Sequence, residues 1–179
     1  MTSKLAQLLA HYVSSHSPTE RWQAGECGVG EFSIDAGGRW YHQGDEIKRL
    51  ALVKLFASVL CREDGAYRLK TPSETCLVTV DASPFVIVAW HECQIAAQYG
   101  VAPTIICEDN LGRFWPICDT FPLYLDDYKG QQIPHLTLNY GLHARIDRNV
   151  FYQWVEIAEL SEQNDIMLLR SAGKTFELS

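Results

Sequence analysis

The sequence lacks long apolar runs and has little positive charge. Its 179 residues include 15 Lys and Arg against 22 Asp and Glu, which gives a formal net charge of −7. A general nucleic-acid or anionic-membrane surface needs clustered cations, so neither partner class is expected. The apolar runs are far shorter than the roughly 20 residues that span a bilayer, and the N-terminus lacks the apolar region and cleavage site of a secretory signal. We therefore expect a cytoplasmic protein.

Recognisable catalytic and metal-binding motifs are also missing. The sequence contains no G-x-S-x-G, H-E-x-x-H, P-loop or G-x-G-x-x-G pattern. Its six cysteines are widely spread without a C-x-x-C pair, so we expect reduced and mostly buried thiols. His91 and Cys93 offer half of a metal site, but no second ligand pair stands at a suitable spacing. The sequence thus predicts no cofactor, no metal and no catalytic residue, while a cysteine nucleophile beside His42 or His143 stays open.

The most apolar stretch, residues 45–60, predicts a central core helix. Asp45 is a suitable N-cap, and Glu46 adds negative charge at the start of the helix, where the helix dipole favours it. Apolar residues then surround almost the whole helix, and only Lys54 and Ser58 form a narrow polar strip. A helix with so little polar surface usually lies between two layers. A shorter amphipathic helix is expected at the N-terminus, and a longer one over residues 148–161.

Short β-rich segments separated by glycine turns fill most of the remaining chain. Two expected hairpins share a G-R-aromatic sequence after the turn, at Gly38-Arg39-Trp40 and at Gly112-Arg113-Phe114. Glycine permits the positive φ that such tight turns require. Each half has further strands and one well-formed helix. We therefore expect a tandem duplication of α+β units with mostly antiparallel sheets, comprising residues 1–84 and 85–179.

An expected hairpin over residues 135–146 gathers polar side chains. Matching its apolar positions pairs Leu138 with Leu142 and leaves a three-residue loop ending in Gly141. The polar face then carries His135, Thr137, His143 and Arg145, and Arg148 follows at the start of the last helix. Such a face could bind an anion, helped by the free amides of that helix, or be a solvated sheet surface.

Four residues in the first half could either bind a ligand or have a purely structural role. The T-P-x-E sequence at 71–74 forms a capping box, in which Thr71 and Glu74 either cap one another or frame an anion. His42 lies in a strand, where it could hydrogen-bond a ligand or simply occupy a surface position. Arg49 stands near a helix start, against the dipole preference, which indicates an acidic partner inside the protein or on a ligand.

Several of these segments together resemble an uncharacterised bacterial family catalogued as domain of unknown function twelve-eighty-five. The resemblance rests on R-W-Y-H-Q-G at 39–44, L-V-K-L-F-A-S-V-L at 52–60, Asp64-Gly65, T-P-x-E at 71–74, Pro84-Phe85 and G-L-x-A-R-x-x-R at 141–148. It implies a tandem α+β protein whose second half is loosely like a pleckstrin-homology domain. It also implies a pocket between the halves for a nucleotide-like ligand, and a role in signal transduction. Two cations typical of the family are replaced here by Thr75 and Asn139.

We therefore expect a non-catalytic binding or sensory module that holds a small anionic, nucleotide-like molecule between its two units. The residues expected to bind this ligand are His42, Arg49, Thr71, Glu74, His143, Arg145 and Arg148. The cations would meet the negative charge, Glu74 a ribose hydroxyl or an arginine, and the imidazoles would form hydrogen bonds. One alternative is a small hydrolase or transferase using the same cleft. Another is an interaction protein, which would expose a broad apolar patch.

Overall fold

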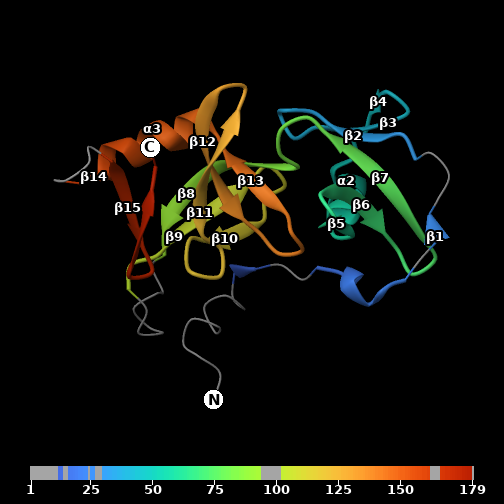
Figure 1. Cartoon of the computed structure of the whole chain (residues 1–179), viewed down its shortest axis with the longest axis horizontal. Helices are drawn as coiled ribbons and strands as arrows, with labels where there is room; N and C mark the ends of the chain where they lie inside the picture. The colour runs from blue at the N-terminus through green and yellow to red at the C-terminus, as the bar shows by residue number, and fades with distance from the viewer. Residues whose placement is uncertain are drawn as a thin grey trace, which may run out of the picture. The chain divides into compact units, whose positions relative to one another are not determined.

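The computed structural model describes residues 12–13, 16–23, 25–26, 30–93, 102–161 and 166–178. The chain divides into two compact units. Figure 1 shows their helices and strands, coloured by residue number from the N-terminus to the C-terminus. The first unit comprises residues 15–85 with 139–143, and the second comprises residues 86–138 and 144–179 with the N-terminal residues. Each unit combines a sheet with one α-helix, so the expected tandem α+β architecture is confirmed. The expected N-terminal helix lies outside the described residues, apart from Tyr12 and Val13.

The first unit is built on a seven-stranded mixed sheet. Its strands are β1 (Gly25–Glu26), β2 (Phe32–Ile34), β3 (Trp40–His42), β4 (Asp45–Glu46), β5 (Leu60–Glu63), β6 (Ala66–Lys70) and β7 (Glu74–Val80). The order across the sheet is β4-β3-β2-β7-β6-β5, and β1 also pairs with β7. The pairs of β7 with β1 and β2 are parallel, and the other pairs are antiparallel. A short 3₁₀ helix, η1 (Thr19–Arg21), precedes these strands.

Helix α2 (Leu50–Ala57) is half the expected length. Asp45 belongs to strand β4 instead of capping a helix, and Leu60 already begins β5. The stretch 45–60 that looked like one helix therefore contains a short strand, the whole of α2 and the start of another strand. The 3.6-residue and two-residue periods are hard to separate where nearly every position is apolar.

Only one side of α2 is buried, so the prediction of a helix sandwiched between layers is wrong. Val53 and Ala57 are buried, and the ring of Phe56 has its centroid 5.2 Å from that of Phe32. The opposite side exposes leucines, with Leu55 at 59% of its full accessible surface. The helix therefore packs on the sheet through a narrow strip of side chains.

The second unit contains a six-stranded sheet, a three-stranded sheet and the longer helix. The strands are β8 (Phe85–Glu92), β9 (Ile105–Asp109), β10 (Phe114–Pro116), β11 (Leu123–Tyr128), β12 (Gln131–Thr137), β13 (His143–Ile146), β14 (Glu159–Leu160), β15 (Met167–Ser171) and β16 (Lys174–Glu177). The larger sheet has the order β10-β9-β8-β13-β12-β11, and the smaller one β14-β15-β16. Helix α3 (Arg148–Ile157) begins where predicted and buries Val150 and Trp154.

A buried serine joins the small sheet to the larger one. The hydroxyl of Ser171, at the end of β15, donates to the Ile117 carbonyl at 2.7 Å and accepts from the Ile105 amide at 2.9 Å. Ser171 is almost fully buried, so both hydrogen bonds lie away from water. They fix the β15–β16 hairpin against β9.

The two larger sheets share a strand order, which supports the duplication. The series β3-β2-β7-β6-β5 of the first unit matches β10-β9-β13-β12-β11 of the second, with β8 inserted between β9 and β13. Corresponding hairpins are closed by Asp64-Gly65 and by Lys129-Gly130. All four turn residues have positive φ, at 51°, 80°, 55° and 79° in that order. Positive φ at both central residues is the geometry of a type I′ turn, which suits the twist of paired strands.

The cysteines mostly follow the sequence prediction. Cys61, Cys93, Cys107 and Cys118 are free and buried. Cys76 is disulfide-bonded, so the expectation of reduced thiols is wrong for this residue. Cys27 lies outside the described residues. Among the helices of the described ranges, none is long and apolar enough to span a bilayer.

Candidate functional site

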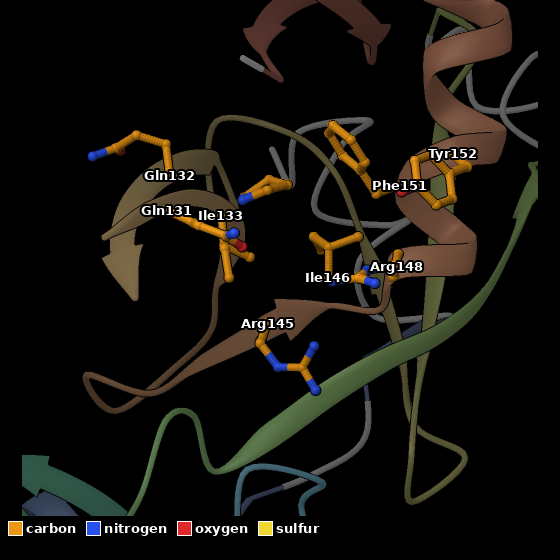
Figure 2. A pocket seen from close by; sticks show the side chains of 9 residues that line it. Gln131, Gln132, Ile133, Arg145, Ile146, Arg148, Phe151 and Tyr152 are labelled. Atoms are coloured by element: carbon orange, nitrogen blue, oxygen red, sulfur yellow. The ribbon is translucent and has the colours of Figure 1, made fainter. Parts of the chain in front are cut away.

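A pocket of about 380 Å³ lies in the second unit, at the start of α3. Figure 2 shows its side chains coming from three elements: β12, β13 and α3. The lining residues are Gln131, Gln132, Ile133, Pro134, Arg145, Ile146, Arg148, Phe151 and Tyr152. The pocket therefore combines two guanidinium groups and two carboxamides with apolar and aromatic side chains. A few polar groups on an apolar lining are typical of small-molecule sites.

The pocket is positively charged although the chain as a whole is acidic. Arg145 and Arg148 are its charged lining residues, and no Asp or Glu is among the described residues that line it. Arg145 is half-buried in β13, whereas Arg148 is exposed in the first turn of α3. A guanidinium group can present two parallel N–H donors to a carboxylate or phosphate. The arrangement is suited to an anion.

The N-terminus of α3 contributes less to this charge than the sequence predicted. Asp147 is the N-cap, and its carboxylate accepts a hydrogen bond of 2.9 Å from the amide of Asn149. One amide that a bound anion could have used is therefore already satisfied, and a negative charge stands beside it. The attraction for an anion comes chiefly from the arginine side chains.

The structure brings together two of the seven predicted ligand-binding residues, Arg145 and Arg148, in this pocket. The other five belong to the first unit. His42 is exposed at the end of β3, where its ring stacks on Phe32 at 4.5 Å. Arg49 is the N-cap residue of α2, and it provides no side-chain capping hydrogen bond.

Thr71 forms hydrogen bonds with the backbone of Glu74, in a turn that leads into β7 and not at the start of a helix. The Thr71 hydroxyl accepts from the Glu74 amide and donates to the Glu74 carbonyl, both at 3.1 Å. The Thr71 amide also donates to that carbonyl, at 2.9 Å. These bonds occupy the groups that an anion at this turn would need, which favours the structural interpretation.

His143 is buried, although the sequence placed it on a polar face that would either bind an anion or be solvated. Its Nε2 lies 3.2 Å from the hydroxyl of Tyr67, and its carbonyl accepts from the Ser83 hydroxyl at 3.1 Å. The turn that precedes it differs from the expected three-residue loop. The Leu142 amide donates to the Asn139 carbonyl, and the two central residues, Tyr140 and Gly141, have φ of 61° and 70°.

His135 is also buried, although the sequence placed it on a polar face. Its Nδ1 lies 2.9 Å from the Ile133 carbonyl, and its ring stacks on Tyr124 with centroids 5.6 Å apart. Burial lowers the pKa of His135, because desolvation penalises the imidazolium, while the hydrogen bond to Ile133 acts in the opposite direction. His135 therefore lies buried in β12, the strand whose residues 131–134 line the pocket.

Sequence reasoning missed the aromatic and amide part of the pocket. Phe151, Tyr152 and the two glutamines are not among the residues that the sequence predicts to bind the ligand. A positional indication was present: Phe151 and Tyr152 follow Arg148 at i+3 and i+4, so all three share one side of a helix. Gln131 and Gln132 could be added only once β12 was known to lie beside β13.

A second pocket, of about 270 Å³, lies in the first unit and has both acidic and basic lining residues. It is lined by Trp22, Gln23, Glu63, Asp64, Arg68, Lys70 and Thr75. Lys70 Nζ lies 2.7 Å from Glu63 Oε1, so two of its charges already neutralise one another. Thr75 stands where the family resemblance led us to expect lysine. This pocket is a weaker candidate for an anion than the one beside α3.

Three histidines form hydrogen bonds to groups other than a serine or cysteine side chain. These bonds connect His16 with the Ser17 and Leu60 carbonyls, His135 with the Ile133 carbonyl, and His143 with the Tyr67 hydroxyl. In the described ranges, no three His, Cys, Asp or Glu side chains are grouped as metal ligands.

Two family models together cover most of the chain. Residues 17–83 match the model described as "Domain of unknown function (DUF1285), N-terminal domain". Residues 84–178 match "Protein of unknown function (DUF1285), C-terminal domain". No curated protein shows significant similarity to the chain.

Two crystal structures of similar proteins support this assignment. A DUF1285 family protein from Silicibacter pomeroyi DSS-3 is 28% identical, with a TM-score of 0.80, and the match covers 99% of this chain and 95% of that one. A DUF1285 family protein from Shewanella baltica OS155 is 27% identical, with a TM-score of 0.58, and the match covers 76% of this chain and 98% of that one. The same two-part architecture is therefore found in solved structures.

Proposed function

The chain belongs to the DUF1285 family, and from that premise we propose that it is a non-catalytic module that binds a small anionic ligand in the pocket at the start of α3. The observation that supports this most directly is the pairing of Arg145 and Arg148 in a pocket without an acidic lining residue among those described. Two guanidinium groups on one pocket of a protein with net charge −7 provide a locally positive site, to which a carboxylate or phosphate would be attracted.

The lining also indicates what the ligand carries besides its charge. Phe151, Tyr152 and Ile146 provide an apolar and aromatic wall, and Gln131 and Gln132 provide donors and acceptors on the β12 side. A planar ring could stack on the aromatic side chains while its phosphate or carboxylate meets Arg148. Nucleotides and aromatic carboxylates both have this combination. A sensory role follows if occupancy of the pocket is read by a partner.

Binding can be tested by a thermal-shift screen followed by calorimetry. The panel contains inorganic phosphate, nucleoside monophosphates, cyclic and linear dinucleotides, and benzoate. A ligand that binds only the native state raises the melting temperature by mass action. Arg148→Ala is expected to weaken binding about tenfold or more, since a hydrogen bond to a charged group contributes about 1.5–3 kcal/mol. Arg145→Ala is expected to act in the same direction.

Arg170→Ala is the matched control, because Arg170 is an exposed arginine of the same unit outside the pocket. It should leave the affinity unchanged. Binding that survives the double Arg145→Ala, Arg148→Ala variant would place the ligand elsewhere. Turnover of the bound compound would instead favour the hydrolase or transferase alternative, which predicts a Ser or Cys nucleophile in hydrogen-bond reach of a histidine.

A further inference from the structure

The outer edge of strand β5 is covered by the side chain of His16 and the backbone of Tyr140. Strand β5 lies at one end of the sheet of the first unit. The Leu60 carbonyl of this strand lies 2.9 Å from His16 Nε2, and the Arg62 amide donates to the Tyr140 carbonyl, also at 2.9 Å. The rings of His16 and Tyr140 stack on one another, with centroids 3.9 Å apart. Since an edge strand otherwise leaves such backbone groups unpaired, these two residues close part of the sheet edge.

Both nitrogens of the His16 ring face carbonyl oxygens. Nδ1 lies 2.7 Å from the Ser17 carbonyl oxygen, and Nε2 faces Leu60. A carbonyl oxygen only accepts hydrogen bonds, and a neutral imidazole has a single N–H donor. A neutral ring would therefore hold one nitrogen lone pair against an oxygen, whereas an imidazolium donates to both. The face of the Tyr140 ring, stacked on His16, also favours a cation.

Two charged side chains of β5 contact residues other than His16. The guanidinium carbon of Arg62 lies 5.3 Å from the centroid of the Tyr67 ring, and Glu63 accepts from Lys70 at 2.7 Å. The other charged or titratable groups on the end of α2, on β5, beside the turn at residues 139–142 and on the segment of His16 itself are Lys54, Cys61, His143, Glu20 and Arg21. Within the described residues, the contacts of His16 with two carbonyls and a stacked ring therefore favour its charged form.

His16 stands at the start of a segment that forms one side of a pocket. The Ser17 amide donates to the Ser58 carbonyl at 3.0 Å, and the Thr19 amide donates to the Ser17 carbonyl at 2.7 Å. Thr19 is fully buried and begins η1. Residues 22 and 23 follow and line the second pocket, of about 270 Å³. The bonds of His16 thus hold the beginning of segment 16–23 against β5.

We propose that His16 is a pH-sensitive latch, which fastens segment 16–23 to the edge of β5 as an imidazolium and releases the start of this segment as a neutral imidazole. Loss of the proton removes one of the two donors and the cation that contacts Tyr140. Because Thr19 stays buried, the opening is local and does not unfold the first unit. The protonated ring is stabilised only in the folded chain. Its contribution to stability is therefore fully present below about 6.5, the ordinary value for histidine, and is lost as the pH rises through the midpoint of the folded-state titration.

Nuclear magnetic resonance of the full chain between pH 6 and pH 8 tests the proposal. The ¹⁵N shifts of the His16 ring report its protonation, and we expect a titration midpoint above about 6.5. Hydrogen exchange of the Ser17 amide, corrected for the intrinsic exchange rate at each pH, reports whether the segment is fastened. Its protection should fall about tenfold or more as His16 loses its proton, which is the effect expected from losing one charge-assisted hydrogen bond.

Two variants separate His16 from other titrating groups. His16→Phe retains a ring that can stack on Tyr140 but has no donor, so the Ser17 amide should show the lower protection at every pH. His42→Phe is the matched control, because His42 also stacks on an aromatic ring, that of Phe32, with centroids 4.5 Å apart. It should leave the pH dependence of Ser17 protection unchanged. Circular dichroism establishes that both variants are folded.

Three results would overturn the proposal. They are a His16 midpoint at or below about 6.5, a Ser17 protection that stays constant from pH 6 to pH 8 in the wild type, and a His16→Phe variant with the same pH dependence as the wild type. The first two are measured on the unaltered chain, so they decide the question even where His16→Phe fails to fold.

Discussion

Asp109 holds Arg113 through a single carboxylate oxygen: Nε and Nη2 of the guanidinium both lie 2.8 Å from Oδ2. The same oxygen accepts from the indole of Trp115 at 3.0 Å. The other oxygen accepts from the amides of Leu111 and Arg113, at 2.9 and 3.0 Å. One aspartate thus organises the whole turn between β9 and β10 and the side chains that leave it.

The first unit repeats this arrangement. Asp35 accepts from the amides of Gly37 and Arg39, from Arg39 Nε at 2.8 Å and from the Tyr41 hydroxyl at 3.0 Å. Burial alone would raise the pKa of Asp35, but the hydrogen bonds from Arg39, Tyr41 and Gly37 hold it below its ordinary value. The two turns share the sequence pattern D-x-x-G-R-x-[YW]. Matching side-chain contacts therefore support the duplication, in addition to the strand order.

The two aspartates should differ in their contribution to stability. The Asp109 side chain is fully buried and Arg113 is 14% exposed, whereas the Arg39 side chain is 64% exposed. Asp109→Ala removes the carboxylate that pairs with a buried cation, which costs about 3–5 kcal/mol. Asp35→Ala should cost much less, because water can solvate Arg39. Urea unfolding followed by intrinsic fluorescence measures both, and equal losses would contradict the difference in burial.

This pattern shows what the sequence could and could not predict. The G-R-aromatic repeat identified both hairpins correctly, because turn chemistry is local. The aspartate four residues before each arginine was visible in the sequence, but its role emerged only from the contacts. Helix α2 was predicted too long because an apolar run does not distinguish a helix from the strand that follows it. Arg145 and Arg148 were correctly placed near each other because they flank the end of β13, whereas the glutamines required knowledge of strand pairing.

Gly141 is a turn residue with no room for a side chain. Its φ is 70°, and a Cβ atom there would lie 2.8 Å from the carbonyl oxygen of Arg62. Gly65 has a similar φ of 80°, but a Cβ atom built there would meet no atom beyond its chain neighbours within 4 Å. We expect Gly65→Ala to cost about 1–2 kcal/mol from the left-handed backbone conformation alone. Gly141→Ala should cost clearly more, because the backbone of residue 62 must also move.

Chemical denaturation of the two glycine variants, side by side, provides the comparison. Both residues belong to the first unit, so the same unfolding transition reports on them. A Gly141→Ala protein as stable as Gly65→Ala would show that the turn at residues 139–142 has room beside Arg62.

The lowered pKa of the buried His135 predicts that the protein loses stability in mild acid. Its pKa is lowered in the folded protein, so between that value and the ordinary value of 6.5 the unfolded chain binds more protons. The unfolding free energy should therefore fall as the pH drops below 6.5 and level off below the folded-state pKa.

His135→Phe retains an aromatic ring beside Tyr124 and should remove this dependence. The measurement is a series of urea titrations between pH 7 and pH 5, with His42→Phe at an exposed position as the control. A slope that persists unchanged in His135→Phe would assign it to another group.

The cysteines predict a two-step pattern of alkylation. Burial raises the pKa of both Cys107 and Cys61, which disfavours the reactive thiolate, and the four free cysteines among the described residues are buried. Iodoacetamide should therefore label the native protein slowly. After unfolding in urea without a reductant, Cys61, Cys93, Cys107 and Cys118 should react, whereas Cys76 should react only once a reductant has opened its disulfide. Peptide mapping by mass spectrometry identifies the partner of Cys76, and Cys76→Ser should leave that partner reactive before reduction. Six labelled cysteines in unreduced protein, purified in air, would show that the disulfide does not form in solution and would restore the sequence prediction of reduced thiols throughout.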